Sequence, residues 1–410
     1  MSRHLWRTLA LAAIALPGLA AAAPLTLEQA LELAVQRSYA TRSARAAASS
    51  ATEVARAAGQ LPDPTLSVGL ENMPVTGPDR FSTTRDSQTM KRIGIYQEWV
   101  SADKRSARAA AARAMVEREQ VAERAATADA RLQTALAYLD AWYAGEALKL
   151  ATLDEHHAHE ALEVGKGRLA TSAGSSADVL ALTASLGMAE DASAEVRQRL
   201  GLAAVALQRW IGVPADELSG PAFDPVASEA AFVTGHPAVA LKQREIEVAR
   251  QDAAATATNR MPNWTWGVSY GQRSGYSDMV TVAVNIPLTV APAERQDRET
   301  AAKLALVDRA EAELAEAQRT AQAEHDAWVG DVRRLRERLE RFRASVLVPA
   351  GQRTAAATAA YRSNQGSLVM LFEARHAEVE AQRRLLELQR DLARTQAQLA
   401  YRPLVIGAAP

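Results

Sequence analysis

The stretch RLATSAGSSADVL, residues 168–180, interrupts a long alanine-rich segment whose pattern is otherwise typical of an α-helix. A similar stretch, YRSNQGSLVML, occupies residues 361–371 and interrupts a second long segment. Each stretch contains a basic residue, a glycine and serines. Glycine permits the chain to reverse, and serine can cap the helix that follows the reversal. We therefore interpret the two stretches as the turns of two helical hairpins, at about 101–210 and 293–400.

The two hairpins belong to an internal repeat. Similar segments recur in the same order: AAGQLPDPTLSVGL (57–70) with TATNRMPNWTWGVSYG (256–271), and YQEWVSADKRSARAAAARA (96–114) with NIPLTVAPAERQDRETAAKLA (285–305). The offset between matched residues stays between 190 and 200. Self-similarity at a nearly fixed spacing indicates a duplicated structural unit. We assign 23–220 to the first repeat and 221–410 to the second.

Each repeat is expected to contain two β-strands between its first helix and its hairpin. The expected strands are 65–72, 91–100, 263–271 and 279–288. In the last of them Val280, Val282 and Val284 alternate with polar or small residues, and Trp264 and Tyr276 lie near segment ends. This pattern is typical of transmembrane strands with aromatic residues at the membrane surface. An ordinary soluble hairpin has the same period and stays open as an alternative.

The first helix of each repeat is expected at 27–58 and 238–259, and Pro62 or Pro262 follows it and ends it. In the two long helices that precede the turns, Pro349 is the only proline. At a rise of 1.5 Å per residue each long helix would span on the order of 100 Å. Because no single globular core is that wide, the helices must lie side by side in a coiled-coil bundle or barrel, with alanine at the close contacts.

The composition argues against several classes of protein. The chain has no cysteine, so we expect no disulfide, thiolate metal site or lipid-modified cysteine. A net charge of −1 argues against a nucleic-acid-binding protein. The H-E-x-x-H motif and the P-loop do not occur, and we therefore expect neither an enzyme nor a bound cofactor.

Residues 1–22 are expected to be a secretory signal peptide. Arg3 and Arg7 precede a short apolar run, LALAAIALPGLAAAA, which ends in small residues that suit a cleavage site. The run is too short to be a good transmembrane helix. A buried N-terminal helix is the alternative interpretation. The pattern favours an exported protein.

The whole arrangement resembles the TolC-type outer-membrane efflux family, over essentially all of residues 24–405. Each chain of that family has two repeats of a helix, a strand hairpin, a long helix and a return helix. The resemblance implies a mainly α fold with a transmembrane β-barrel, in which three chains each contribute four strands to a twelve-stranded barrel. It also implies a long periplasmic α-barrel, in which the first helix of each repeat stacks end to end on the return helix.

Two segments are similar to the heavy-metal branch of the family, the outer-membrane components of resistance-nodulation-division efflux systems. They are ENMPVTGPDRF at 71–81 and TMKRIGIYQEWVSADKRSAR at 89–108. Many relatives in that branch carry an N-terminal cysteine for lipid attachment, and this chain does not. The branch implies that heavy-metal cations are exported. Drug efflux and type I protein secretion are the alternatives within the family.

The resemblance also implies roles for residues at the two turns, which in the family dock on a periplasmic adaptor protein. By position, the docking residues are Arg168, Leu169, Gly174, Ser175, Ser176, Tyr361, Arg362, Gly366, Ser367 and Leu368. Asp178 and Glu373 follow the turns, where rings of carboxylates would favour cations and form the pore constriction. Ordinary hairpin turns and ordinary surface carboxylates are the alternatives.

The segment DEHHAHE, 154–160, contains a cluster of histidines. His156 and His159 are three residues apart and therefore share one face of a helix. In a metal exporter they would form a candidate transient metal site. A solvated, charged helix face is the alternative.

The resemblance therefore implies a homotrimeric channel in the cell outer membrane, with its α-barrel in the periplasm. Its expected partners are outer-membrane lipid, a periplasmic adaptor (membrane fusion) protein and an inner-membrane resistance-nodulation-division pump, with no nucleic acid. A periplasmic coiled-coil adaptor or a structural protein is the alternative from a different class. An adaptor would have one hairpin flanked by β-domains, and a structural coiled coil would lack the paired strand hairpins.

Overall fold

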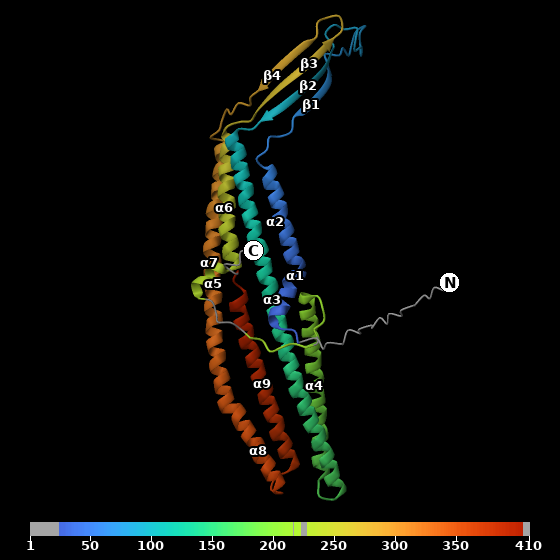
Figure 1. Cartoon of the computed structure of the whole chain (residues 1–410), viewed down its shortest axis with the longest axis vertical. Helices are drawn as coiled ribbons and strands as arrows, with labels where there is room; N and C mark the ends of the chain where they lie inside the picture. The colour runs from blue at the N-terminus through green and yellow to red at the C-terminus, as the bar shows by residue number, and fades with distance from the viewer. Residues whose placement is uncertain (1–23, 216, 223–227, 405–410) are drawn as a thin grey trace, which may run out of the picture.

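The computed structural model describes residues 24–215, 217–222 and 228–404 (Figure 1). The predicted signal peptide lies outside these residues. The described chain forms a long rod, with a four-stranded sheet at one end and two helical hairpin turns together at the other. Within this part of the chain, no helix combines the length and the apolar character needed to cross a membrane.

The sheet is antiparallel, with the strand order β1-β2-β3-β4. Its strands are β1 Thr65–Glu71, β2 Met90–Trp99, β3 Trp264–Arg273 and β4 Met279–Asn285. The central pair joins the two repeats, because β2 belongs to the first and β3 to the second. β4 ends two residues before Pro287, which cannot donate to a strand ladder. A mainly helical chain with four strands confirms the expected fold class.

Each repeat begins with two helices, α1 Leu27–Arg37 and α2 Tyr39–Ala57 in the first repeat and α5 Glu229–Gly235 and α6 Pro237–Ala257 in the second. The breaks fall at Ser38 (φ −61°, ψ 117°) and His236 (φ −64°, ψ 128°), which are extended in nearly the same way. The Ser38 side chain accepts a hydrogen bond from Thr41 N at 3.1 Å and so caps α2. Our prediction of one continuous helix at 27–58 is therefore wrong.

The short helices stack on the return helices, α4 Ser176–Ile211 and α9 Leu368–Tyr401. Figure 1 shows α2 continuing the line of α4, and α6 continuing that of α9. At the first junction the Arg37 guanidinium donates to the carbonyl of Ile211 at 3.2 Å. At the second, Leu404 N donates to the carbonyl of Gly235 at 2.6 Å. Each stack therefore runs alongside a long helix as a single column.

The two long helices differ between the repeats. α3 Ala102–Ala170 is continuous over 69 residues, and Ser101 caps its start. Its counterpart consists of α7 Gln296–Phe342, a π-helical turn at Arg343–Leu347 and α8 Val348–Arg362. Pro349 lacks an amide hydrogen, and its ring would collide with the carbonyl four residues earlier in a regular α-helix. The wider π turn accommodates this proline without ending the helix.

The core is a set of thin clusters along the rod. In the largest, Tyr138 and Leu139 of α3 are fully buried against α1, α4 and α9, and alanines fill the close contacts. The Tyr138 hydroxyl lies 2.6 Å from the carbonyl of Leu25 and 2.7 Å from that of Ser219. Burial raises the pKa of this phenol. The cluster therefore ties the chain before α1 and the chain after α4 to the middle of α3.

Candidate functional site

The two hairpin turns, the predicted docking site, have the same backbone hydrogen bonds at an offset of 192 residues. The donor and acceptor pairs are Ser172 N to Leu169 O (3.0 Å) and Ala173 N to Arg168 O (2.9 Å) in the first turn, and Asn364 N to Tyr361 O (3.1 Å) and Gln365 N to Ala360 O (2.8 Å) in the second. Such bonds satisfy carbonyls at the end of a helix. The two turns are therefore equivalent parts of the repeat.

The residues that reverse the chain are not the glycines. Ser172 (φ 58°) and Asn364 (φ 57°) have the left-handed conformation in the two turns. Gly174 and Gly366 instead lie against the end of the preceding helix, where an added Cβ would stand 3.0 Å from Leu169 N in the first turn and 3.1 Å from Ala360 Cβ in the second. Our expectation that glycine supplies the reversal is corrected. Gly174 and Gly366 instead allow each turn to pack closely against the end of the preceding helix.

The serines cap the returning helices, as their positions indicate. Ser175 accepts a hydrogen bond from Ala177 N and begins α4 at Ser176, and Ser367 accepts one from Met370 N and begins α9, each at 3.1 Å. Serine at this position satisfies an amide that the helix itself leaves unpaired. Both return helices therefore begin at a fixed residue.

The two tips contact each other. The guanidinium carbon of Arg168 lies 5.8 Å from the centre of the Tyr361 ring, a cation–π arrangement across the hairpins. The same guanidinium donates to the carbonyl of Ala173 at 3.2 Å within its own turn. Arg362 and Leu169 remain exposed. The paired tips therefore present one surface with basic and apolar groups.

An apolar cluster above the tips holds the hairpins together. Leu162 of α3, Leu182 of α4 and Phe372 of α9 are buried in it, and Leu368 packs against it. Of the predicted docking residues, Leu368 therefore faces the other hairpin. A Cβ on Gly165 would stand 2.8 Å from Leu182 Cδ1, so this glycine allows α3 and α4 to approach closely.

A hydrogen-bonded pair of a buried aspartate and a half-exposed histidine joins α3 and α9 beside this cluster. His376 Nδ1 lies 2.8 Å from Asp154 Oδ2, and the Asp154 side chain is 6% exposed. The other oxygen, Asp154 Oδ1, is buried and has no hydrogen-bond partner among the described residues. The hydrogen bond to Asp154 raises the pKa of His376, against the opposing effect of burial. Phe372 stacks on the imidazole at 6.0 Å. Sequence analysis missed this pair, because its members lie 222 residues apart.

The predicted constriction residues lie just beyond the turns. Asp178 is in the first turn of α4, where a carboxylate is favoured by the helix dipole, and its side chain is exposed. Glu373 is exposed between two buried neighbours, Phe372 and Ala374, so it lies on the face of α9 that points away from the cluster. Both carboxylates are therefore available to a partner or to a pore.

The predicted metal ligands lie on an exposed face of α3. His156 Nε2 is 3.3 Å from Glu160 Oε1, and His159 is exposed. Between them, His157 is half-buried, and desolvation lowers its pKa. In the described chain, one group of three His, Asp or Glu residues has ligand atoms within 4.8 Å of one another, and it lies elsewhere. Metal binding at His156 and His159 stays a prediction.

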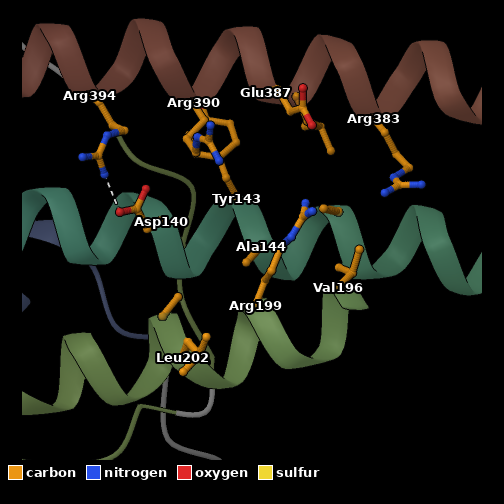
Figure 2. Close-up of a pocket in the computed structure, with 13 residues that line it drawn as sticks. Asp140, Tyr143, Ala144, Val196, Arg199, Leu202, Arg383, Glu387, Arg390 and Arg394 are labelled. Carbon is orange, nitrogen blue, oxygen red and sulfur yellow. Dashed lines mark hydrogen bonds and ion pairs between the residues drawn. The ribbon is translucent and has the colours of Figure 1, made fainter. Parts of the chain in front are cut away.

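A cavity of about 520 Å³ lies between α3, α4 and α9 (Figure 2). Four arginines line it: Arg199, Arg383, Arg390 and Arg394. Each arginine is paired with a carboxylate, namely Glu195, Glu380, Asp391 and Asp140 respectively. The cavity wall is therefore a network of ion pairs and has no excess of positive charge that would select an anion.

The sheet has one apolar and one polar or small face. Across all four strands, Val68 pairs with Ile93, Ile93 with Tyr270 and Tyr270 with Val280, and all four side chains are exposed. The parallel row of Leu66, Ile95, Val268 and Val282 is exposed as well. Between the two rows, Ser67, Gly94, Ser269 and Thr281 point to the opposite face. The alternation read from the sequence therefore produces a continuous apolar face.

No protein-family model and no curated protein matches the chain. Solved structures do match it. A membrane protein from Pseudomonas aeruginosa is 16% identical, with a TM-score of 0.75 over 92% of this chain and 90% of the other. CusC, whose structures concern folding and transmembrane channel formation, is 13% identical, with a TM-score of 0.74 over 92% and 91%. The open state of the MtrE outer-membrane channel of Neisseria gonorrhoeae is 16% identical, with a TM-score of 0.72 over 92% and 88%. The chain therefore has the fold of outer-membrane channels.

Proposed function

We propose that this protein is the outer-membrane channel of a tripartite efflux system, which receives substrate from an inner-membrane pump through a periplasmic adaptor. The observation that carries the proposal is the exposed apolar face that crosses all four strands at one end of the rod. A contiguous apolar surface of this kind marks contact with lipid or with another protein. The likeness to solved outer-membrane channels favours lipid.

The edges of the sheet support a trimer. Among the described residues β1 pairs only with β2, and β4 only with β3, which leaves one edge of each without a partner. Unpaired backbone groups in a membrane must be satisfied by another strand. We propose that β1 of one copy pairs with β4 of the next, so that three copies close a twelve-stranded barrel.

The paired tips are the proposed docking surface for the adaptor. They lie at the end of the rod opposite the sheet, about 100 Å away by the rise of α3. Leu169, Met370 and Arg362 are exposed there, and apolar groups with an arginine are typical of protein interfaces. Rings of Asp178 and Glu373 would form the pore constriction beside the paired tips.

Heavy-metal cations are the proposed substrate, with drugs or secreted proteins as alternatives. Rings of carboxylates at a narrow mouth support the assignment of cations as substrate, because such rings raise the local concentration of cations. A deletion strain is expected to lose tolerance to one or more of copper, silver, zinc, cobalt or cadmium. Unchanged tolerance to all five would contradict the metal assignment and leave the channel assignment standing.

Fractionation tests the channel itself. We expect the protein in the outer-membrane fraction, as a trimer that migrates differently in gels before and after heating. A monomeric, soluble periplasmic protein would overturn the proposal.

Two charge-reversal variants, one at the tip and one away from it, test docking. Arg362→Glu is expected to abolish efflux and adaptor cross-linking while the trimer still assembles. The matched control is Arg319→Glu, since Arg319 is an exposed arginine on α7, away from the tips. Equal efflux in the two variants would show that the second tip does not dock.

A further inference from the structure

We propose that Glu229, His325 and Asp326 form a binding site for a divalent cation of the zinc and cobalt class, which fastens α5 to α7. One ligand atom from each side chain lies within 4.8 Å of the other two. Bonds of about 2.0–2.2 Å to nitrogen and oxygen place two ligands of one ion at most about 4.4 Å apart. The three groups therefore need only a small inward movement to share an ion.

The imidazole is the rigid member of the group. The His325 side chain is 9% exposed, and its ring lies 5.4 Å from that of Phe232, which is fully buried. Trp328 in turn meets Phe232 edge to face at 5.7 Å. This aromatic packing fixes the orientation of the imidazole before any ion arrives, and a ligand held in place loses less entropy on binding.

The carboxylates are the adaptable members. Glu229 is in the first turn of α5, and Gln322 on α7 donates a hydrogen bond to its Oε1 at 2.9 Å. Metal-binding side chains are commonly oriented by such a hydrogen bond from a residue that does not itself bind the ion. Asp326 Oδ1 lies 3.3 Å from His325 Nδ1. Both acids are exposed, so water can complete the coordination.

The ligand set determines the class of ion. One imidazole and two carboxylates suit zinc, cobalt or manganese, whereas a copper(I) site would use thiolate or thioether ligands. Because the ligands come from two helices, the ion would add a link beside the break at His236, where α5 ends. This site does not depend on the proposed transport function, and it differs from the predicted site at His156 and His159.

The test uses the purified full chain, stripped of metal and titrated with Co²⁺ alone, followed by visible absorption and calorimetry. We expect one ion per chain at this site and a higher melting temperature with the ion. Glu229→Gln and Asp326→Asn, which preserve side-chain volume at exposed positions, should each weaken binding by about 10- to 100-fold. Both should also lose the ion-dependent rise in melting temperature.

The matched control is Glu316→Gln, which removes an exposed carboxylate of α7 that belongs to no proposed site. It should leave Co²⁺ binding unchanged. Three results would overturn the proposal: no binding by the wild-type chain, unchanged affinity in Glu229→Gln, or loss of binding only in the Glu316→Gln control. None of these results bears on whether the protein is a channel, which fractionation measures separately.

Discussion

Replacing His376 by glutamine is expected to loosen the contact between α3 and α9 near the tips. A hydrogen bond to a charged group contributes about 1.5–3 kcal/mol, and exposed ion pairs contribute at most about 1 kcal/mol. The Asp154 side chain is buried, whereas that of His376 is 46% exposed, and solvent screens that side of the pair. We therefore expect a coupling energy of about 1–2 kcal/mol in a cycle of His376→Gln, Asp154→Asn and the double variant.

The coupling should depend on pH with a defined sign. Asp154 of α3 and Glu380 of α9 raise the pKa of His376, while burial and Arg383 of α9 lower it, and the net effect is a raised value. Stabilisation from a raised imidazole pKa is complete below the ordinary value of about 6.5 and is lost as the pH rises through the folded pKa. The coupling should therefore be larger at pH 6 than at pH 9.

Hydrogen exchange of the α9 amides around His376 is the appropriate assay, because it reports local opening and does not require two-state unfolding of the whole chain. Exchange rates corrected for intrinsic pH dependence give the opening free energy of each variant. The exposed pair of His156 and Glu160 provides the control, and it should show no measurable coupling. Equal coupling at both pH values, or none at pH 6, would refute the reasoning.

Three further substitutions have expected outcomes. Phe232→Ala removes a fully buried ring and should cost about 3–5 kcal/mol, seen as a lower melting temperature. Tyr138→Phe removes a hydroxyl that contacts two carbonyls and should cost about 1–2 kcal/mol, measured by the same melting experiment. Gly267→Ala would place a Cβ 2.2 Å from the Tyr96 ring and should reduce the yield of folded sheet. Gly69→Ala is the control, because the space around Gly69 is open and the yield should not change. The shift in gel migration on heating measures the folded fraction of each variant.

Local patterns explain why much of the fold was predictable. Alternation of valines marks β4, and prolines such as Pro62 mark where the first helices have ended, so the order of elements follows from short windows of sequence. The break at Ser38 was not predictable in this way, because serine occurs within helices as well as at their caps. The second long helix was expected to run through Pro349, and it does so with a π turn that the sequence pattern did not indicate.

The candidate sites, too, were predictable only where a short window of sequence determines them. Both turns were located from glycine and serine, but the reversing residues are Ser172 and Asn364. Asparagine adopts the left-handed conformation more readily than most residues, whereas serine has no such preference that would single out Ser172. The contact of Arg168 with Tyr361 and the pair of Asp154 with His376 depend on how two hairpins from different repeats lie together. A periodic pattern within one hairpin contains no information about that placement.

The π turn at Arg343–Leu347 makes the two repeats mechanically unequal. The 15 residues of α8 that follow it form a lever of about 22 Å at 1.5 Å per residue. A change of 10° in bend at the turn would move the second tip sideways by about 4 Å, roughly the width of a methyl group, while the unbroken α3 would transmit no such local bend. The first hairpin therefore has an unbroken long helix and the second has one with a π turn, so that substitutions near Pro349 would change the position of the second tip without altering the first.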